Sequence, residues 1–129
     1  MLEQMNGLNM SLLEFSLFET EGVTGFGPPI DWNQDGDAID DRFGWAVSLS
    51  SDGNTVAIGA YQNDGNGTNS GHVRIYNWGG SSWNQLGNDI DGEASGDSFG
   101  CAVSLSSDGT TLAIGAYNND GNGTGAGHV

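Results

Sequence analysis

The segment Phe43–Val73 has the sequence FGWAVSLSSDGNTVAIGAYQNDGNGTNSGHV, and Phe99–Val129 repeats it as FGCAVSLSSDGTTLAIGAYNNDGNGTGAGHV. The two segments align at an offset of 56 residues without a gap, and 25 of their 31 positions are identical. The one large change of volume is Trp45, which aligns with Cys101. Self-similarity at a fixed spacing is typical of proteins that stack one supersecondary unit per copy. The chain therefore contains two successive copies of one structural unit.

Each copy has the pattern of a meander of short β-strands. Larger apolar residues alternate with small ones in Phe43–Ser50, and Thr55–Ala60 alternates in the same way. Between them, Ser51–Asn54 contains the Asp-Gly pair typical of a tight hairpin. After a polar loop, His72–Tyr76 and a segment around Trp83–Leu86 predict two further strands. The larger side chains of the first strand share one face: Phe43, Trp45, Val47 and Leu49. We therefore expect a four-stranded antiparallel sheet in each copy.

The predicted fold class is all-β. A single sheet of this kind carries apolar side chains on both faces, so it must stack on neighbouring sheets. We predict a partial β-propeller of about two four-stranded antiparallel blades, the second of which is incomplete because the sequence stops within its third strand. The first blade is assigned to residues 31–87 and the second to residues 88–129, after an irregular N-terminal segment, residues 1–30, that matches the repeat weakly. Within that segment, Ser11–Glu14 fits a helix capping box, whereas Leu13, Phe15 and Leu17 fit one face of a strand; both interpretations stay open.

The charge balance excludes several classes of partner. Seventeen acidic residues face only Arg42 and Arg74, lysine is absent, and the formal net charge is −15. Nucleic-acid phosphates and anionic lipids would be repelled, because both are bound through Lys and Arg. No apolar run is long enough to insert into a membrane, and the single cysteine, Cys101, cannot form an internal disulfide. Divalent cations and basic partners are the natural counterparts of such a surface.

The order of motifs in each copy resembles the FG-GAP repeat of integrin α-chain β-propellers. The signature pairs are Phe43-Gly44 with Ile58-Gly59-Ala60, and Phe99-Gly100 with Ile114-Gly115-Ala116. The resemblance implies a seven-bladed propeller, usually extracellular or at the cell surface, used for adhesion or ligand recognition. It also implies calcium in some hairpins, but the hairpins here, each with the single carboxylate of Asp52 or Asp108, are too poor in oxygen ligands for calcium. We expect these hairpins to be turns only.

Most acidic residues fall in segments that an up-and-down meander brings to one end. These segments are the approach to the first strand and the loop between the second and third strands. They contain Asp31, Asp35, Asp37, Asp40, Asp41, Asp64, Asp89, Asp91, Glu93, Asp97 and Asp120. Only Asp52 and Asp108 are left for the opposite end after residue 30. One rim should therefore be strongly negative.

The acidic rim suggests a Ca²⁺ site, because crowded carboxylates repel one another unless a cation separates them. The first hypothetical ligand set lies within the second blade: Asp89, Asp91, Glu93, Asp97, Asp120 and Asn122. The equivalent set in the first blade is Asp35, Asp37, Asp41, Asp64 and Asn66. An alternative stays open, in which Asn63–Gly67 forms consecutive Asx turns and the acids serve only solubility.

His72 and His128 begin equivalent strands, and we expect them to pack rather than to bind a metal, because no His-x-x-x-His spacing or nearby glutamate accompanies them. No catalytic motif stands out in the sequence. The function that we predict is a non-catalytic binding or adhesion module for an unidentified protein or glycan, which needs further blades or self-association to close a propeller. The alternatives are scaffold blades of a larger extracellular enzyme that acts on polysaccharide, and a fragment without independent activity.

Overall fold

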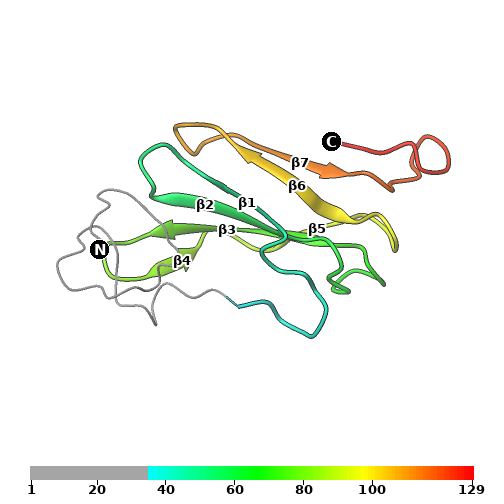
Figure 1. Ribbon diagram of the computed structural model, residues 1–129, viewed down its shortest axis with the longest axis horizontal. Helices are drawn as coiled ribbons and strands as arrows, with labels where there is room; N and C mark the ends of the chain where they lie inside the picture. The colour runs from blue at the N-terminus through cyan, green and yellow to red at the C-terminus, as the bar shows by residue number, and fades with distance from the viewer. Residues whose placement is uncertain (1–34) are drawn as a thin grey trace. The chain divides into compact units, whose positions relative to one another are not determined.

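The computed structural model describes residues 35–129, which form seven β-strands and no helix (Figure 1). The chain divides into two compact units, of which one comprises Asp35–Asn77 with Asn84–Val129, and the other comprises residues 1–34 with Trp78–Trp83. Between residues 35 and 129 there is no helix of the length and apolarity needed to cross a bilayer. The predictions for residues 1–30 lie outside the described residues. The all-β prediction is confirmed.

In the unit that contains Trp78–Trp83, only this short segment is described. The indole rings of Trp78 and Trp83 lie 5.4 Å apart with an interplanar angle of 59°. The backbone N–H of Gly79 donates a hydrogen bond to the carbonyl of Ser82 at 2.9 Å. The segment is therefore a tight turn with two tilted, contacting indoles at its base.

The first sheet follows the predicted meander. Its main path runs β1 (Ala46–Leu49), β2 (Thr55–Ala60), β3 (His72–Trp78) and β4 (Trp83–Gln85), with neighbours in that order. In the β1–β2 hairpin Val47 is opposite Ile58, and the turn is closed by the Gly53 N–H, which donates to the Ser50 carbonyl at 3.0 Å. The two strands and the Asp-Gly turn between them therefore form the hairpin that the sequence predicts.

Strand β1 begins three residues later than predicted. Arg42 and Gly44 have φ angles of 62° and 89°, and the N–H of Trp45 donates to the carbonyl of Arg42 at 3.0 Å, so the chain turns here before it becomes extended. The second copy has the same irregularity, a bulge between Phe99 and Ala102 with Gly100 at φ 87°. Positive φ at this position explains why the Phe-Gly pair carries a glycine.

A short strand that the sequence did not predict joins the two copies. Strand β5 (Ile90–Asp91) pairs antiparallel with the beginning of β3, so that Asp91 is opposite His72. The second sheet then contains β6 (Phe99–Leu105) and β7 (Leu112–Ala116). An isolated bridge between Ala116 and His128 marks the beginning of a third strand in this sheet. The described second sheet therefore has two of the strands that the sequence predicts for each copy and a bridge where the third would begin.

The two sheets stack through small residues. Strands β1 and β2 pack against β6, and a Cβ placed on Gly59 would overlap the carbonyl oxygen of Gly100. The backbone N–H of Leu105 donates to Ser48 Oγ at 2.9 Å across this junction. The core is thin, since its fully buried hydrophobic residues are small: Ala57, Ala60 and Val73. Close backbone approach, rather than bulky side chains, sets the spacing of the two blades.

Candidate functional site

The acidic residues gather at the loop end of the sheets. The segment before β1, the β2–β3 loop, and the chain on either side of β5 all lie at the end where β2 finishes and β3 starts. Together with the loop after β7, which contains Asp120, these segments carry every described acidic residue except Asp52 and Asp108, which occupy the two hairpins at the opposite end. The described acids are therefore distributed as the sequence predicts.

A pocket of about 430 Å³ opens at this end. Its walls come from the segment before β1, the β2–β3 loop, the start of β3 and the β5 region. The lining residues are Asp37, Ala38, Ile39, Asp41, Asn63, Asp64, Gly65, His72, Asp89 and Asp91. Five of these are carboxylates, so the pocket is an electronegative cavity.

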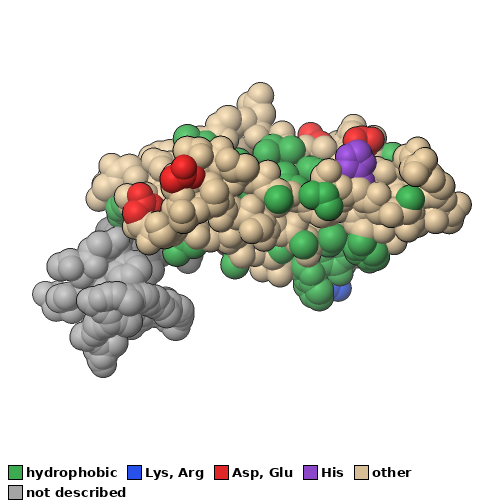
Figure 2. Space-filling view, turned by 90° about the horizontal axis from the view of Figure 1, so that it is seen from above, with side chains coloured by type: hydrophobic (Ala, Val, Ile, Leu, Met, Phe, Trp, Pro, Cys, Tyr) green, Lys and Arg blue, Asp and Glu red, His purple; other side chains and the backbone are tan. Residues whose placement is uncertain are grey.

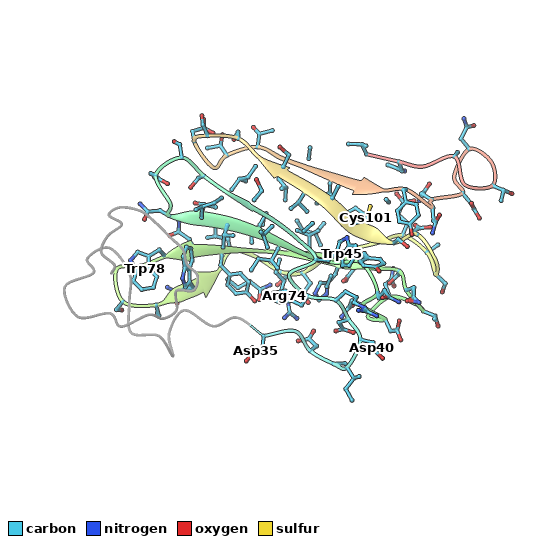
Figure 3. All side chains as sticks on the ribbon, in the orientation of Figure 1. Asp35, Asp40, Trp45, Arg74, Trp78 and Cys101 are labelled. Carbon is cyan, nitrogen blue, oxygen red and sulfur yellow. The ribbon has the colours of Figure 1, made fainter. Side chains whose placement is uncertain are left out.

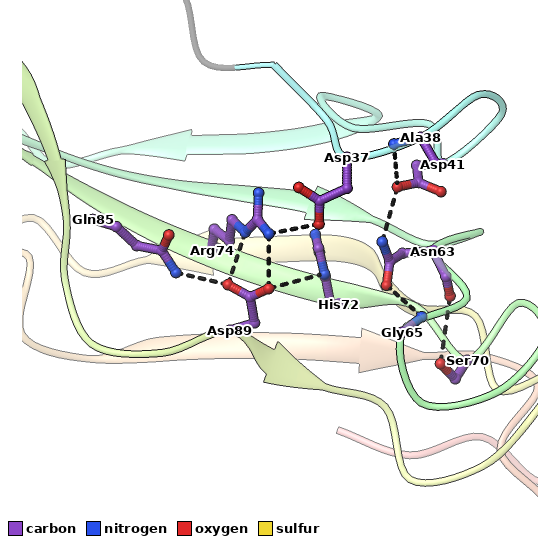
Figure 4. Close-up of polar contacts among 10 residues, drawn as sticks. All are labelled: Asp37, Ala38, Asp41, Asn63, Gly65, Ser70, His72, Arg74, Gln85 and Asp89. Atoms are coloured by element: carbon purple, nitrogen blue, oxygen red, sulfur yellow. Dashed lines mark hydrogen bonds and ion pairs between the residues drawn. The ribbon is translucent and has the colours of Figure 1, made fainter.

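Arg74 on β3 partly neutralises one side of the pocket (Figure 4). Its Nη2 lies 2.6 Å from Asp37 Oδ2, and its Nε and Nη2 donate to the two oxygens of Asp89, each at 2.8 Å. Gln85 Nε2 also donates to Asp89 at 2.7 Å. The hydrogen bond from Arg74 lowers the pKa of Asp89 to about 2, and Asp89 in turn raises the pKa of Arg74 above its ordinary value. This side of the pocket therefore contains a bidentate ion pair between Arg74 and Asp89, and Asp37 contacts the same guanidinium group.

His72 stands beside this ion pair and is almost fully buried, with 1% of its surface exposed. Its Nδ1 is 3.6 Å from Asp89 Oδ2, whereas its Nε2 has no hydrogen-bond partner. The ring of Phe43 approaches it edge-on, with centroids 6.4 Å apart. Potential ligand atoms of Asp37, His72 and Asp89 lie within 4.8 Å of one another. The sequence missed this acidic neighbour of His72, because Asp89 is brought there by the unpredicted β5.

Asp41 holds the wall of the pocket together. Its Oδ2 accepts hydrogen bonds from Asn63 Nδ2 at 2.8 Å and from the backbone N–H of Ala38 at 3.2 Å. Asn63 Oδ1 in turn accepts from the N–H of Gly65 at 2.8 Å. The second copy reproduces this network through Asp97, which accepts from Asn119 and Ala94 at 2.9 and 3.1 Å. The two buried aspartates therefore fix loop geometry in both blades.

Asp64, Asp120 and Asn66 are engaged in loop hydrogen bonds. Asp64 Oδ1 accepts from the N–H of Asn69 at 2.7 Å, and Asp120 Oδ1 accepts from Gly125 at 2.6 Å. Asn66 Nδ2 donates to the carbonyl of Gly92 at 2.8 Å. Among the other residues of the hypothetical ligand sets, Asp35 and Asn122 are exposed. These hydrogen bonds from backbone N–H groups to loop side chains agree with the interpretation of Asn63–Gly67 as consecutive Asx turns.

The pocket combines residues from both hypothetical ligand sets. Asp37, Asp41 and Asp64 belong to the first-blade set, but Asp89 and Asp91, which the sequence assigned to the second blade, line the same cavity. The equivalent place in the second copy contains Glu93, Asp97 and Asp120 near His128, whose Nδ1 is 4.0 Å from Glu93 Oε2. Residues of both hypothetical sets line one cavity because β5, which the sequence assigned to the second blade, pairs with β3 of the first sheet.

Comparison with protein families agrees with this architecture. The FG-GAP repeat matches the chain twice, at residues 33–76 and at residues 90–129, which is more than half of its length. A search of curated proteins finds no match to the chain. The chain belongs to the FG-GAP repeat family, and its two stacked sheets are blades of the β-propeller module that this repeat builds.

Proposed function

We propose that this chain is a non-catalytic binding module of the adhesion type, and that its acidic pocket holds Ca²⁺. The observation that carries the proposal is the pocket of about 430 Å³ lined by five carboxylates contributed by two successive repeats. Carboxylate oxygens are the ligands that Ca²⁺ prefers, and a cation bound there would relieve their mutual repulsion. The resemblance to integrin repeats favours an extracellular or cell-surface location for such a module.

Three carboxylates are the best candidates to hold the ion. Asp89 has both oxygens engaged by Arg74, and Asp41 Oδ2 accepts two hydrogen bonds from the loop. Asp37, Asp64 and Asp91 keep at least one carboxylate oxygen outside the hydrogen bonds described above, and all three line the pocket. We expect these three to supply the charge, with water and backbone carbonyls completing the six to eight oxygens around Ca²⁺.

The pKa of Asp89 bears on the alternative of a polysaccharide hydrolase. Glycoside cleavage by a carboxylate pair needs one carboxyl group whose pKa is raised, so that it can donate a proton at neutral pH. The hydrogen bond from Arg74 lowers the pKa of Asp89 to about 2 instead. Asp89 is therefore unsuited to be the general acid of such a pair.

The proposal is tested by calorimetric titration of the full chain with Ca²⁺, together with thermal melting in Ca²⁺ and in EDTA. We expect a saturable heat and a higher melting temperature in Ca²⁺, since a ligand that binds only the folded state stabilises it. The double variant Asp64→Asn, Asp91→Asn should lose both effects.

Asp40→Asn is the matched control. Asp40 lies in the same acidic segment but does not line the pocket, and its φ of 68° is readily adopted by asparagine. This variant removes the same charge and should bind Ca²⁺ like the wild type. Titration without heat and without a melting shift would refute the calcium site, and equal losses in both variants would indicate diffuse screening instead of a site. Release of reducing sugar from a polysaccharide panel would instead support the enzyme alternative.

A further inference from the structure

His72 is buried in the wall of the acidic pocket, and its imidazole has an unused lone pair. Only 1% of its surface is exposed. Its Nε2 has no hydrogen-bond partner among residues 35–129, and its Nδ1 lies 3.6 Å from Asp89 Oδ2, which is beyond hydrogen-bond distance. A neutral imidazole carries one N–H group and one lone pair. Whichever nitrogen holds the proton, no described residue donates to the lone pair of His72, and a buried polar group in this state needs an explanation.

Two carboxylates converge on the ring of His72. Potential ligand atoms of Asp37, His72 and Asp89 lie within 4.8 Å of one another, and Figure 4 shows the ring between the two carboxylates. We expected His72 only to pack, because the sequence places no acidic residue near it, but the pairing of β5 with β3 supplies one. Imidazole nitrogen with carboxylate oxygen is a ligand set that suits Zn²⁺ and similar first-row ions, whereas Ca²⁺ takes oxygen ligands. The nitrogen therefore indicates a different ion from the one that the oxygen ligands of the pocket suit.

Arg74 holds these two carboxylates close together. Its Nη2 donates to Asp37 Oδ2 at 2.6 Å and to Asp89 Oδ2 at 2.8 Å. An ionised carboxylate oxygen has two lone pairs, so each of these oxygens keeps one for a metal ion. Carboxylates that ligate a metal are themselves hydrogen-bonded by outer residues, which orient them. The low pKa of Asp89, about 2, keeps this ligand ionised at neutral pH. Arg74 is therefore placed as a positioning residue of a metal site.

We propose that Asp37, His72 and Asp89 form a second metal site in the pocket, which takes Zn²⁺ or a similar divalent first-row ion. Three protein ligands leave a fourth tetrahedral position for water. The five carboxylates that line the pocket and the guanidinium of Arg74 have a formal charge of −4, of which one Ca²⁺ would compensate half. Asp37 belongs to both ligand sets, and its Oδ1 takes part in no hydrogen bond with residues 35–129. The zinc site goes beyond the proposed calcium site and does not depend on it.

The chain has few other nitrogen or sulfur ligands, since it contains two histidines and one cysteine. Cys101, which Figure 3 labels together with Arg74, donates to a backbone carbonyl of its own sheet at 3.4 Å and does not line the pocket. The side chain of His128 is 49% exposed, and its Nδ1 is 4.0 Å from Glu93 Oε2. Figure 2 shows one histidine on the surface beside acidic side chains, and because His72 is buried this is His128. His128 is therefore the internal control.

The proposal is tested by calorimetric titration of the full chain, without a polyhistidine tag, with Zn²⁺ in the absence and in the presence of excess Ca²⁺. We expect saturable Zn²⁺ binding that Ca²⁺ does not abolish, because Ca²⁺ competes poorly for an imidazole nitrogen. His72→Gln should weaken Zn²⁺ binding by more than about tenfold, since even the loss of an outer partner of a ligand costs about 10- to 100-fold. His128→Gln should bind Zn²⁺ like the wild type, and equal binding by His72→Gln would overturn the proposal.

The double variant Asp64→Asn, Asp91→Asn separates the two metal sites. It removes two carboxylates proposed for Ca²⁺ and none of the zinc ligands, so it should retain Zn²⁺ binding after its Ca²⁺ binding is lost. His72→Gln should show the reverse, with Ca²⁺ binding retained. Failure of one proposal is therefore distinguishable from failure of the other. Zn²⁺ that excess Ca²⁺ displaces completely would show that zinc occupies only the oxygen ligands, which would refute the zinc site.

Nitrogen-15 spectra of the imidazole rings keep the proposal testable if His72→Gln does not fold. The wild-type chain with labelled histidine gives signals from two rings, and the spectrum of His128→Gln assigns them. Zn²⁺ should shift a ring-nitrogen signal of His72 and leave both signals of His128 in place. A shift of His128 alone, or of neither ring, would contradict the proposed site.

Discussion

Gly59 and Gly100 meet backbone to backbone across the junction of the two blades, and a side chain at Gly59 would occupy the position of the Gly100 carbonyl oxygen. These are the glycines of the Ile-Gly-Ala triplet of one repeat and the Phe-Gly pair of the next. The two parts of the repeat signature are thus the two sides of one contact. Their spacing in the sequence reflects how consecutive blades stack.

The matched substitutions Gly59→Ala and Gly115→Ala should therefore change the free energy of unfolding in different ways. At Gly59 the added methyl must push the blades apart, which we expect to lower the free energy of unfolding by about 1–3 kcal/mol, as overpacking does. At Gly115 the φ angle is ordinary and the methyl has room, so the change should be neutral or stabilising by about 0.4–1 kcal/mol. Urea unfolding at low protein concentration measures both. Equal destabilisation by the two would contradict the close approach at Gly59.

Removing the buried carboxylate of Asp41 should weaken the first blade. In Asp41→Ala, Asn63 Nδ2 and the N–H of Ala38 lose their acceptor, at a cost of about 1–3 kcal/mol. Asp97→Ala should cost a similar amount, because Asn119 and Ala94 make the same contacts there. Asp35→Ala, at an exposed position, is the control and should lie within about 0.5 kcal/mol of wild type. Thermal and urea unfolding measure the differences.

The pairing of Asp89 with Arg74 should make stability depend on acid pH. The pKa of Asp89 is lowered from 3.8 to about 2 in the folded protein, chiefly by the hydrogen bond from Arg74. The ionised Asp89 therefore stabilises the folded state fully above about pH 4, and this contribution is lost as the pH falls from about 4 to 2. Allowing for solvent screening, the contribution is on the order of 1 kcal/mol. The stability difference between wild type and Asp89→Asn should shrink over this interval, and a constant difference from pH 6 to pH 2 would contradict the pairing.

Arg74→Gln should strengthen cation binding if the pocket is a Ca²⁺ site. The substitution removes the positive charge that engages Asp37 and Asp89 and leaves both carboxylates available to the ion. We expect Ca²⁺ affinity to rise by roughly tenfold at low ionic strength, while the calcium-free protein becomes less stable because two carboxylates lose their partner. Calorimetry and melting in EDTA check the two effects separately. Unchanged affinity would mean that the ion does not contact this side of the pocket.

The repeating architecture was predictable because local patterns and packing agree. Alternation over Thr55–Ala60 and the Asp-Gly hairpin specify strands and turn without distant partners. The early part of Phe43–Ser50 was predicted as strand, but positive φ at Arg42 and Gly44 makes it a turn. The alternation of side chains does not reveal this, because it records which positions are apolar and not the φ angles of the residues between them.

The composition of the pocket was less predictable, because it depends on a pairing of distant segments. Ile90–Asp91 is too short and too polar to be recognised as a strand, yet its pairing with β3 carries Asp89 and Asp91 to the first blade. One feature of the sequence indicates a structural role for Arg74. It is one of only two basic residues in a chain with 17 acids, and it lies within a predicted strand. A partly buried cation of this kind favours a carboxylate partner, although the sequence does not say which one.

The pairing of β5 with β3 has a further consequence for modularity. The cavity straddles the boundary at which one sequence repeat gives way to the next, so the repeated unit of the sequence and the set of residues that lines one cavity are offset from each other. Exchanging a whole repeat by recombination would keep the main four-stranded path of each sheet, but it would replace the strand that the next repeat adds and so create a hybrid cavity at each seam. In such a protein new specificity can arise without a single point mutation in a loop.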